Sequence, residues 1–249
     1  MFYFDDFYGK KILKSTLLSD IDCFFTTREF VLTPSNREDL EEECKQNRIF
    51  LKNKLNCNEI TTAKQTHSSN IEVIKDKNFF YDDTDALISN TKNSLLLMNF
   101  ADCVPIILYS RKDNTGAIVH AGWRGTATEI LKKTIMKMRN ELNIQPKDIT
   151  ALIGPAIGKC CFETDYDVFR QLVKDKSNTQ LYKEQNLKYY IDLKELNNIQ
   201  LKELGVENID ICSYCTCCMS DIFFSYRKEK GITARHSAII KIKGDNICQ

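Results

Sequence analysis

His67, Cys103 and His120 are the residues of this sequence whose types and positions best suit catalysis. Each follows a run of residues that predicts a strand, and each stands where that strand gives way to a turn. Imidazole and thiolate groups suit Zn²⁺, and a catalytic zinc site takes three protein ligands and keeps one open position. No short ligand motif links the three residues, so the spacing also allows a buried structural cysteine and two unrelated histidines.

The remaining histidine and the other cysteines are weaker candidates. His236 lies within an alternating segment that predicts a strand, which favours a packed or surface histidine. The segment Cys212–Cys218 resembles a zinc knuckle, but four thiols so close in sequence cannot readily surround one ion without strain. Cys160 and Cys161 form the only other adjacent pair. We therefore expect the 212–218 thiols to be core and loop residues rather than a structural zinc site.

The turn Gly122–Gly125 leads into a predicted helix that starts near Thr126, where Glu129 completes a capping box. The unpaired N–H groups and the positive dipole of a helix start attract anions. Arg124 adds a planar cationic group to this turn. The segment therefore favours a phosphate site at Arg124, although a surface arginine beside a core Trp123 fits the same pattern.

Composition and charge are those of an ordinary globular protein. Of the 249 residues, 43% are hydrophobic and 28% are charged, which supports a sizeable core and argues against disorder. The net charge of +1 gives no bulk attraction to nucleic acid or membranes, and the most apolar segment, Leu95–Tyr109, is too short and too polar to span a bilayer. The first residues lack the features of a signal peptide, and the 11 cysteines argue against a disulfide framework. We expect a cytoplasmic protein that binds neither nucleic acid nor membrane.

Strand and helix signals alternate along the chain and indicate a mixed α/β fold. Helices are predicted from Ser35, where Glu38 completes a capping box, from Thr126, and over residues 166–174 and 193–204. The predicted strands cover residues 21–27, 60–66, 71–74, 86–89, 95–100, 106–109, 117–120, 149–153, 189–192, 209–212, 223–226 and 232–242. No repeat or linker interrupts them, so we expect residues 1–249 to form a single domain with helices covering packed sheets.

Six segments of the chain form a specific pattern, namely KQTHSSNI (64–71), DALISN (85–90), NFADCVPIILY (99–109), AIVHAGWRGT (117–126), IGPAIGKCCFE (153–163) and a CT followed by FFSYR (215–227). Their order resembles that of the YfiH/YlmD family, whose members are also called laccase-domain proteins, multicopper polyphenol oxidases or peptidoglycan editing factors (PgeF). The resemblance covers nearly the whole chain, and ADCVP and HAGWRG are its most specific parts in combination.

The resemblance implies a fold, a metal and an activity. The implied fold is a single α-β-β-α sandwich, and the implied metal is zinc bound by His67, Cys103 and His120. The implied activity is that of a purine nucleoside phosphorylase using adenosine, inosine and S-methyl-5′-thioadenosine with phosphate, together with adenosine deamination. Zinc suits deamination because it activates water, which can displace ammonia from C6 of adenine. A multicopper site needs several histidines, so three in the whole chain make copper and laccase chemistry less favoured.

A guanidinium binds oxyanions through charge-assisted hydrogen bonds. The candidates for holding phosphate are therefore Arg124, Arg28, Arg227 and Arg235. Two departures from the family pattern bear on this set. The glycines that follow Arg28 in the family are absent here, and Lys228 stands where the family has a second arginine. Lysine cannot reproduce the bidentate contact of arginine, so an anion contact at position 228 is expected to be weaker.

Four other functions fit the sequence. Cys103 could act as a nucleophile with His120 as its base in a cysteine hydrolase, which needs no zinc. The same zinc site could instead hydrolyse an amide in a peptidoglycan precursor. The third alternative is a copper polyphenol oxidase, and the fourth is a non-enzymatic zinc-binding module that uses the 212–218 thiols. Metal content and a nucleoside turnover screen separate these functions.

Overall fold

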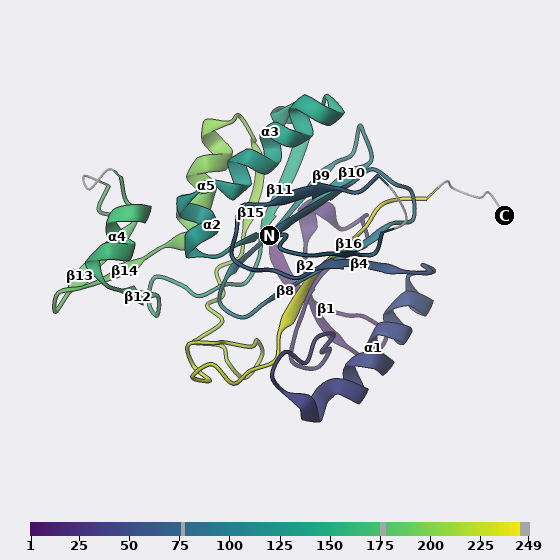
Figure 1. The fold of residues 1–249 in the computed structure, drawn as a ribbon, viewed down its shortest axis with the longest axis horizontal. Coiled ribbons are helices and arrows are strands. Elements are labelled where there is room, and N and C mark those ends of the chain that lie inside the picture. The colour runs from purple at the N-terminus through teal and green to yellow at the C-terminus, as the bar shows by residue number, and fades with distance from the viewer. Residues whose placement is uncertain (76–77, 175–177, 245–249) are drawn as a thin grey trace.

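Two large β-sheets form the frame of the molecule in the computed structural model, which describes residues 1–75, 78–174 and 178–244 (Figure 1). The first sheet has the order β1 (Phe2–Asp6), β2 (Lys11–Ser15), β3 (Cys23–Thr26), β16 (His236–Lys241), β8 (Leu95–Phe100), β4 (Ile60–Ala63) and β6 (Phe80–Tyr81). The second has the order β15 (Asn208–Ile211), β11 (Ile149–Ile153), β9 (Val104–Ser110), β10 (Thr115–Ala121), β7 (Ala86–Ser89) and β5 (Ile71–Val73). Antiparallel pairing dominates both sheets, with parallel pairs at β4 and at the two edges of the second sheet.

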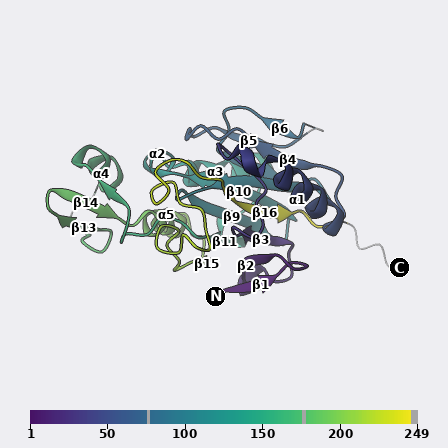
Figure 2. The ribbon, with the colours of Figure 1, turned by 90° about the horizontal axis from the view of Figure 1, so that it is seen from below.

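Helices cover the outer faces of these sheets, and one further helix lies to the side. They are α1 (Glu41–Lys54), α2 (Trp123–Ala127), α3 (Ile130–Leu142), α4 (Tyr166–Leu172) and α5 (Leu193–Glu203), with 3-10 turns at Thr16–Leu18, Glu38–Leu40 and Pro146–Asp148. Figure 1 shows α3 and α5 above the sheets and α1 below them. A small third sheet, β12 (Glu163–Thr164), β14 (Lys188–Ile191) and β13 (Tyr182–Gln185), extends to one side together with α4 (Figure 2).

Side chains alternate along the central strands, and this alternation produces the layers. In β9, Ile107 and Tyr109 belong to the core between the two sheets, whereas Ile106 and Leu108 pack on the side of α3 and α5. In β8, Met98 belongs to the core between the two sheets, whereas Leu95 and Leu97 pack on the side of α1. Both sheets are therefore buried on both faces, as in an α-β-β-α sandwich. The predicted mixed α/β class is confirmed.

Two predicted capping boxes are wrong. Ser35 has a left-handed backbone with φ of 56°, which an N-cap residue does not adopt, and α1 begins only at Glu41 after a 3-10 turn. Near Thr126 the chain forms α2 from Trp123, and Glu129, at φ of 59°, breaks the helix before α3 starts. Tertiary packing of short segments has overridden the local helix-start pattern in both cases.

The strand predictions hold best in the buried centre of the sheets. The predicted ranges 86–89, 95–100 and 149–153 coincide with β7, β8 and β11. Residues 223–226 do not form the predicted strand, because Phe223 closes a tight turn by donating its N–H to the Met219 carbonyl at 2.9 Å. Among the described residues, we find no helix with the length and apolarity needed to cross a membrane.

Candidate active site

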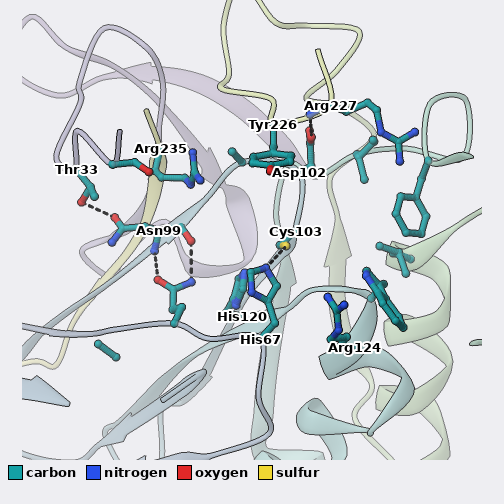
Figure 3. Close-up of a pocket in the computed structure, with 18 of the residues that line it drawn as sticks. Thr33, His67, Asn99, Asp102, Cys103, His120, Arg124, Tyr226, Arg227 and Arg235 are labelled. Carbon is teal, nitrogen blue, oxygen red and sulfur yellow. Dashed lines mark hydrogen bonds between the residues drawn. The ribbon is translucent and has the colours of Figure 1, made fainter. Parts of the chain in front are cut away.

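His67, Cys103 and His120 converge where the two large sheets meet (Figure 3). His67 follows β4 of the first sheet, Cys103 lies in the turn from β8 to β9, and His120 lies near the end of β10. The chain passes from one sheet to the other at Cys103, which explains how strand ends of both sheets reach one point. Their potential ligand atoms all lie within 4.8 Å of one another. The structure therefore brings together all three residues that the sequence indicated.

Close packing fixes the three side chains relative to one another. The Cys103 Sγ atom lies 3.7 Å from His67 Nε2, and the two imidazole rings have centroids 4.9 Å apart. Gly122 allows this approach, since a Cβ atom there would lie 3.0 Å from Cys103 Sγ and 3.1 Å from a ring carbon of His67. A side chain at position 122 would therefore push into the group of ligands.

Asp85 organises this group, although the sequence did not single it out. Its carboxylate is fully buried and accepts a hydrogen bond of 2.6 Å from His120 Nδ1, which leaves Nε2 as the free nitrogen of that ring. It also accepts hydrogen bonds from the backbone N–H groups of Thr66, His67 and Ser68 at 2.8–3.2 Å. These contacts hold the loop in which His67 has a left-handed backbone with φ of 63°. The only sequence signal for Asp85 was its place at the start of the DALISN segment.

The electrostatics of the group favour a thiolate at Cys103. Burial raises the pKa of this thiol, but the charge of His120 and hydrogen bonds from His120 and His67 outweigh burial and lower the pKa to about 6. Burial lowers the pKa of His120, but the Cys103 thiolate and Asp85 outweigh it and raise the pKa to about 9. For Asp85, hydrogen bonds from His120 and Ser68 overcome burial and lower the pKa to about 2.

This donor set suits a metal ion with an open coordination position. Two imidazoles and one thiolate are borderline-soft ligands, which zinc accepts in catalytic sites. A buried carboxylate that fixes the free nitrogen of a ligating histidine is the usual support of such a site. Because all three ligands also line a cavity of about 690 Å³, a substrate can reach the remaining position.

The same cavity contains three of the four predicted phosphate-binding arginines (Figure 3). Arg124 is exposed, and its guanidinium lies 4.3 Å from the Trp123 ring centroid. Arg227 donates to the backbone carbonyls of Cys161 and Glu163 at 2.9 and 3.0 Å. Arg235 donates to the carbonyls of Thr233 and Ala234. The aromatic side chains of Trp123, Phe162 and Tyr226 complete a wall suited to a flat, partly apolar ligand.

Arg28 does not line this cavity. Its Nε atom donates to the backbone carbonyls of Ser220 and Phe223 at 2.6 and 3.1 Å, and its Nη2 atom pairs with Glu229. The guanidinium also lies 4.2 Å from the Phe224 ring centroid. Arg28 thus ties the N-terminal region to the 220–229 segment, and this placement gives no support to the prediction that it binds phosphate.

His236 is separate from the candidate metal site. It is fully buried beside the rings of Phe100 and Phe223, with centroid distances of 6.4 and 5.5 Å. Burial lowers its pKa to about 3, and a contact with the Pro155 backbone offsets part of that shift. The sequence predicted a packed or surface histidine, and His236 is packed.

We predict that this buried histidine makes the protein sensitive to mild acid. The unfolded chain binds a proton at His236 with an ordinary pKa near 6.5, whereas the folded chain does not until about pH 3. The free energy of unfolding should therefore fall as the pH drops below 6.5, by roughly 1.5 kcal/mol at pH 5. Urea unfolding at several pH values checks this, because His236→Phe should have a flatter pH dependence than the wild type. Equal slopes in the two proteins would contradict it.

Comparisons with known proteins point to one family. Residues 31–243 match the family model described as multi-copper polyphenol oxidoreductase laccase. A protein of Bacteroides thetaiotaomicron named purine nucleoside phosphorylase is 30% identical over 235 residues, which cover 84% of this chain and 87% of that protein. A Clostridium acetobutylicum protein of the same name is 37% identical over 207 residues, which cover 80% of this chain and 84% of that protein.

Solved structures agree with this result. The YfiH protein of Bacillus licheniformis superimposes with a TM-score of 0.87 at 27% identity, covering 96% of this chain and 99% of that one. The YlmD protein of Geobacillus stearothermophilus gives a TM-score of 0.85 at 27% identity, with coverage of 96% and 98%. The resemblance drawn from the sequence segments is thereby confirmed, and this chain belongs to the YfiH/YlmD family, whose model carries the description multi-copper polyphenol oxidoreductase laccase.

Proposed function

We propose that this protein is a zinc-dependent purine nucleoside phosphorylase that acts on adenosine, inosine and S-methyl-5′-thioadenosine and also deaminates adenosine. The observation that carries the proposal is that one cavity holds a His/Cys/His ligand set beside arginines and aromatic side chains. The relatives named purine nucleoside phosphorylase support the class of reaction. The chain's three histidines, one of them buried elsewhere, disfavour a multicopper oxidase.

Phosphorolysis requires the protein to hold phosphate against the anomeric carbon of the nucleoside. An oxygen of phosphate forms the new bond to C1′, and the bond from C1′ to the purine nitrogen breaks with its electron pair leaving on the base. Arg124 is the best candidate for holding the phosphate, because no described residue forms an ion pair or hydrogen bond with its guanidinium. Arg227 and Arg235 already donate to backbone carbonyls, so we assign them a supporting role in the same cavity.

The remaining side chains of the cavity serve the base and the metal. Trp123, Phe162 and Tyr226 offer aromatic surfaces on which a purine can stack. A zinc ion on His67, Cys103 and His120 would supply Lewis-acid chemistry and the activation of water for deamination. Asp85 holds Nδ1 of His120 and thereby orients the ring, so that Nε2 is positioned to bind the ion once its proton is displaced.

Replacing Arg124 by alanine tests the phosphate assignment. An arginine–phosphate contact contributes on the order of 1.5–3 kcal/mol, so phosphorolysis should weaken roughly 10- to 150-fold. The effect should appear chiefly as a higher phosphate requirement, while adenosine deamination is spared. Chromatography of adenosine and inosine reactions, following free base and ribose 1-phosphate, measures both activities. Arg139→Ala, which removes an exposed arginine of α3 outside the cavity, is the matched control and should behave as the wild type.

The outcomes of this experiment are distinct. Equal loss of deamination and phosphorolysis in Arg124→Ala would mean that Arg124 shapes the whole pocket and holds no phosphate. Absence of free base from every purine nucleoside, in wild-type protein loaded with zinc, would reject the proposed function itself.

A cysteine hydrolase is the second candidate, because the geometry also provides what it needs. Cys103 has a lowered pKa and contacts a histidine, and Asp85 orients His120 as the third member of a nucleophilic triad would. The two functions differ in their need for metal. A chelator should stop a zinc-dependent phosphorylase and leave a cysteine hydrolase active, so the loss and recovery of activity on chelation and zinc addition separates them.

A further inference from the structure

A second group of metal-binding side chains lies outside the catalytic ligand set. Cys160 and Cys161 come from the loop after β11, and Cys215 and Cys218 come from the loop after β15. Their four sulfur atoms all lie within 4.8 Å of one another. Cys160 Sγ and Cys161 Sγ each lie 3.5 Å from Cys218 Sγ. Two segments that are far apart in sequence thus contribute two thiols each.

Backbone contacts hold the two loops in register at this point. Ala156 and Cys215 form an isolated parallel bridge, and the Thr216 N–H donates to the Ala156 carbonyl at 3.1 Å. The Gly158 N–H donates to Cys215 Sγ at 3.2 Å. A Cβ atom on Gly158 would lie 3.3 Å from Cys160 Sγ and 3.5 Å from Cys215 Sγ, so this glycine leaves room for the sulfurs. The positions of the thiols therefore follow from the fold of both loops.

The spacing of the sulfurs matches that of a tetrahedral metal site. Zinc–sulfur bonds of about 2.3 Å place the four sulfurs of a tetrahedron roughly 3.8 Å apart. Two of the sulfur–sulfur distances are 3.5 Å, close to this value, no pair is more than 4.8 Å apart, and all four cysteines are free thiols. We propose that Cys160, Cys161, Cys215 and Cys218 bind a Zn²⁺ ion as a closed structural site, separate from the candidate site at His67, Cys103 and His120.

The thiols of this cluster shift one another's pKa. Burial, together with hydrogen bonds to neighbouring thiols, raises the pKa of Cys160 to about 11 and raises that of Cys161 further. At Cys215 burial also raises the pKa, but hydrogen bonds from the Gly158 and Cys218 backbones outweigh it. A divalent cation would favour the thiolate form of all four cysteines by displacing their protons.

This inference revises the expectation that the 212–218 thiols form no metal site. The objection was that four thiols within one short segment cannot enclose an ion, and it still applies to that segment. Cys212 is fully buried, and its carbonyl accepts from Lys194 Nζ at 2.5 Å. Cys217 is not part of the four-sulfur group. Cys160 and Cys161, rather than Cys212 and Cys217, complete the group with the other two thiols. The sequence spacing could not reveal this arrangement.

The proposed zinc would stiffen one wall of the catalytic cavity. Arg227 donates to the Cys161 carbonyl at 2.9 Å, and its own N–H donates to Asp102 Oδ2 at 2.7 Å. Thr216 Oγ1 donates to Asp102 Oδ1 at 2.7 Å, next to Cys103 in the chain. The two loops that share the thiols are thus the loops that hold Arg227 and the turn before Cys103. Because a structural zinc is bound only in the folded state, it should also stabilise the fold.

Metal analysis of two pairs of variants tests the site independently of catalysis. With both sites loaded, the wild type should carry about two zinc ions per chain, since each ligand set takes one ion. Cys160→Ser/Cys218→Ser should lose one ion and keep the ion at His67, Cys103 and His120. Cys217→Ser, a change in the same segment but outside the group, is the matched control and should lose none. His67→Ala/His120→Ala should keep the thiolate-bound ion.

A spectroscopic measurement covers the case in which the serine variant does not fold. Cobalt(II) loaded into His67→Ala/His120→Ala should give the intense sulfur-to-cobalt charge transfer and visible bands of a tetrahedral thiolate site. Chelation of that protein should lower its unfolding temperature. The proposal is overturned if reduced, zinc-supplied His67→Ala/His120→Ala binds no metal, if Cys160→Ser/Cys218→Ser keeps every ion of the wild type, or if the four-thiol site of the purified protein holds iron. Failure of the phosphorylase proposal would leave these metal counts unchanged.

Discussion

Replacing Cys103 by alanine should remove the metal from the His67–Cys103–His120 site and abolish nucleoside phosphorolysis. Four-ligand zinc sites are stabilised by on the order of 10–16 kcal/mol, so one ligand accounts for roughly 2.5–4 kcal/mol, or about 10²- to 10³-fold in affinity. The thiolate is the only anionic ligand of the set, and its lowered pKa means that it is ready to bind at neutral pH. Zinc content and phosphorolysis, measured in the same preparations, should fall together.

Cys57→Ala is the control for this experiment. Cys57 belongs to neither of the two ligand groups, and its side chain donates to the Lys52 carbonyl, so zinc content and activity should be unchanged. Full zinc occupancy of the catalytic site in Cys103→Ala would show that the ligand assignment is wrong. If activity were lost in Cys103→Ala while the chelated wild type remained active, Cys103 would be a nucleophile rather than a ligand.

Replacing Asp85 by alanine should have the next largest effect, although Asp85 touches neither metal nor substrate in our account. The change leaves His120 Nδ1 and three backbone N–H groups without their buried acceptor, which should cost about 3–5 kcal/mol in unfolding free energy. Loss of such a carboxylate behind a metal-binding histidine weakens metal affinity about 10- to 100-fold. Zinc titration against a competing chelator and urea unfolding measure the two effects separately.

A positioning role predicts how Asp85 variants respond to metal. Excess zinc should restore most of the activity of folded Asp85→Ala, because the ligands themselves remain. Asp148→Asn is a suitable control, since the Asp148 carboxylate pairs with Lys112 and with none of the metal-site residues. If zinc affinity were normal in Asp85→Ala while activity remained lost at saturating zinc, Asp85 would act directly in the reaction.

The sequence was most informative where local pattern and burial agree. Strands β7 and β11 are buried along their whole length and β8 is buried at every position except Asn99, and their apolar runs predicted their bounds. It was least informative where a short segment depends on distant partners. The hairpin of β1 and β2 at the N-terminus was missed, because its residues are only partly buried and carry charges. The helix starts predicted at Ser35 and Thr126 are wrong, because α1 begins only at Glu41 and α2 begins already at Trp123.

The same contrast applies to the candidate sites. His67, Cys103 and His120 stood out because histidine is rare in this chain and because each residue ends a predicted strand. Asp85 and the pairing of Cys160 and Cys161 with the 212–218 segment depend on loop register, which no local pattern encodes. Arg28 is an arginine like those of the cavity, so the sequence could not distinguish it from them. The structure shows that it contacts backbone carbonyls and Glu229 instead.

The most direct test of the central claim is the identity of the sugar product formed from inosine. Zinc-loaded wild-type protein should convert inosine and phosphate into equimolar hypoxanthine and ribose 1-phosphate, with no cleavage when phosphate is omitted or when Cys103→Ala replaces the wild type. Both products are quantified by chromatography in one reaction. Release of free ribose, or an unchanged rate without phosphate, would identify a hydrolase, and no release of hypoxanthine from the loaded protein would contradict the assignment of nucleoside cleavage to this cavity.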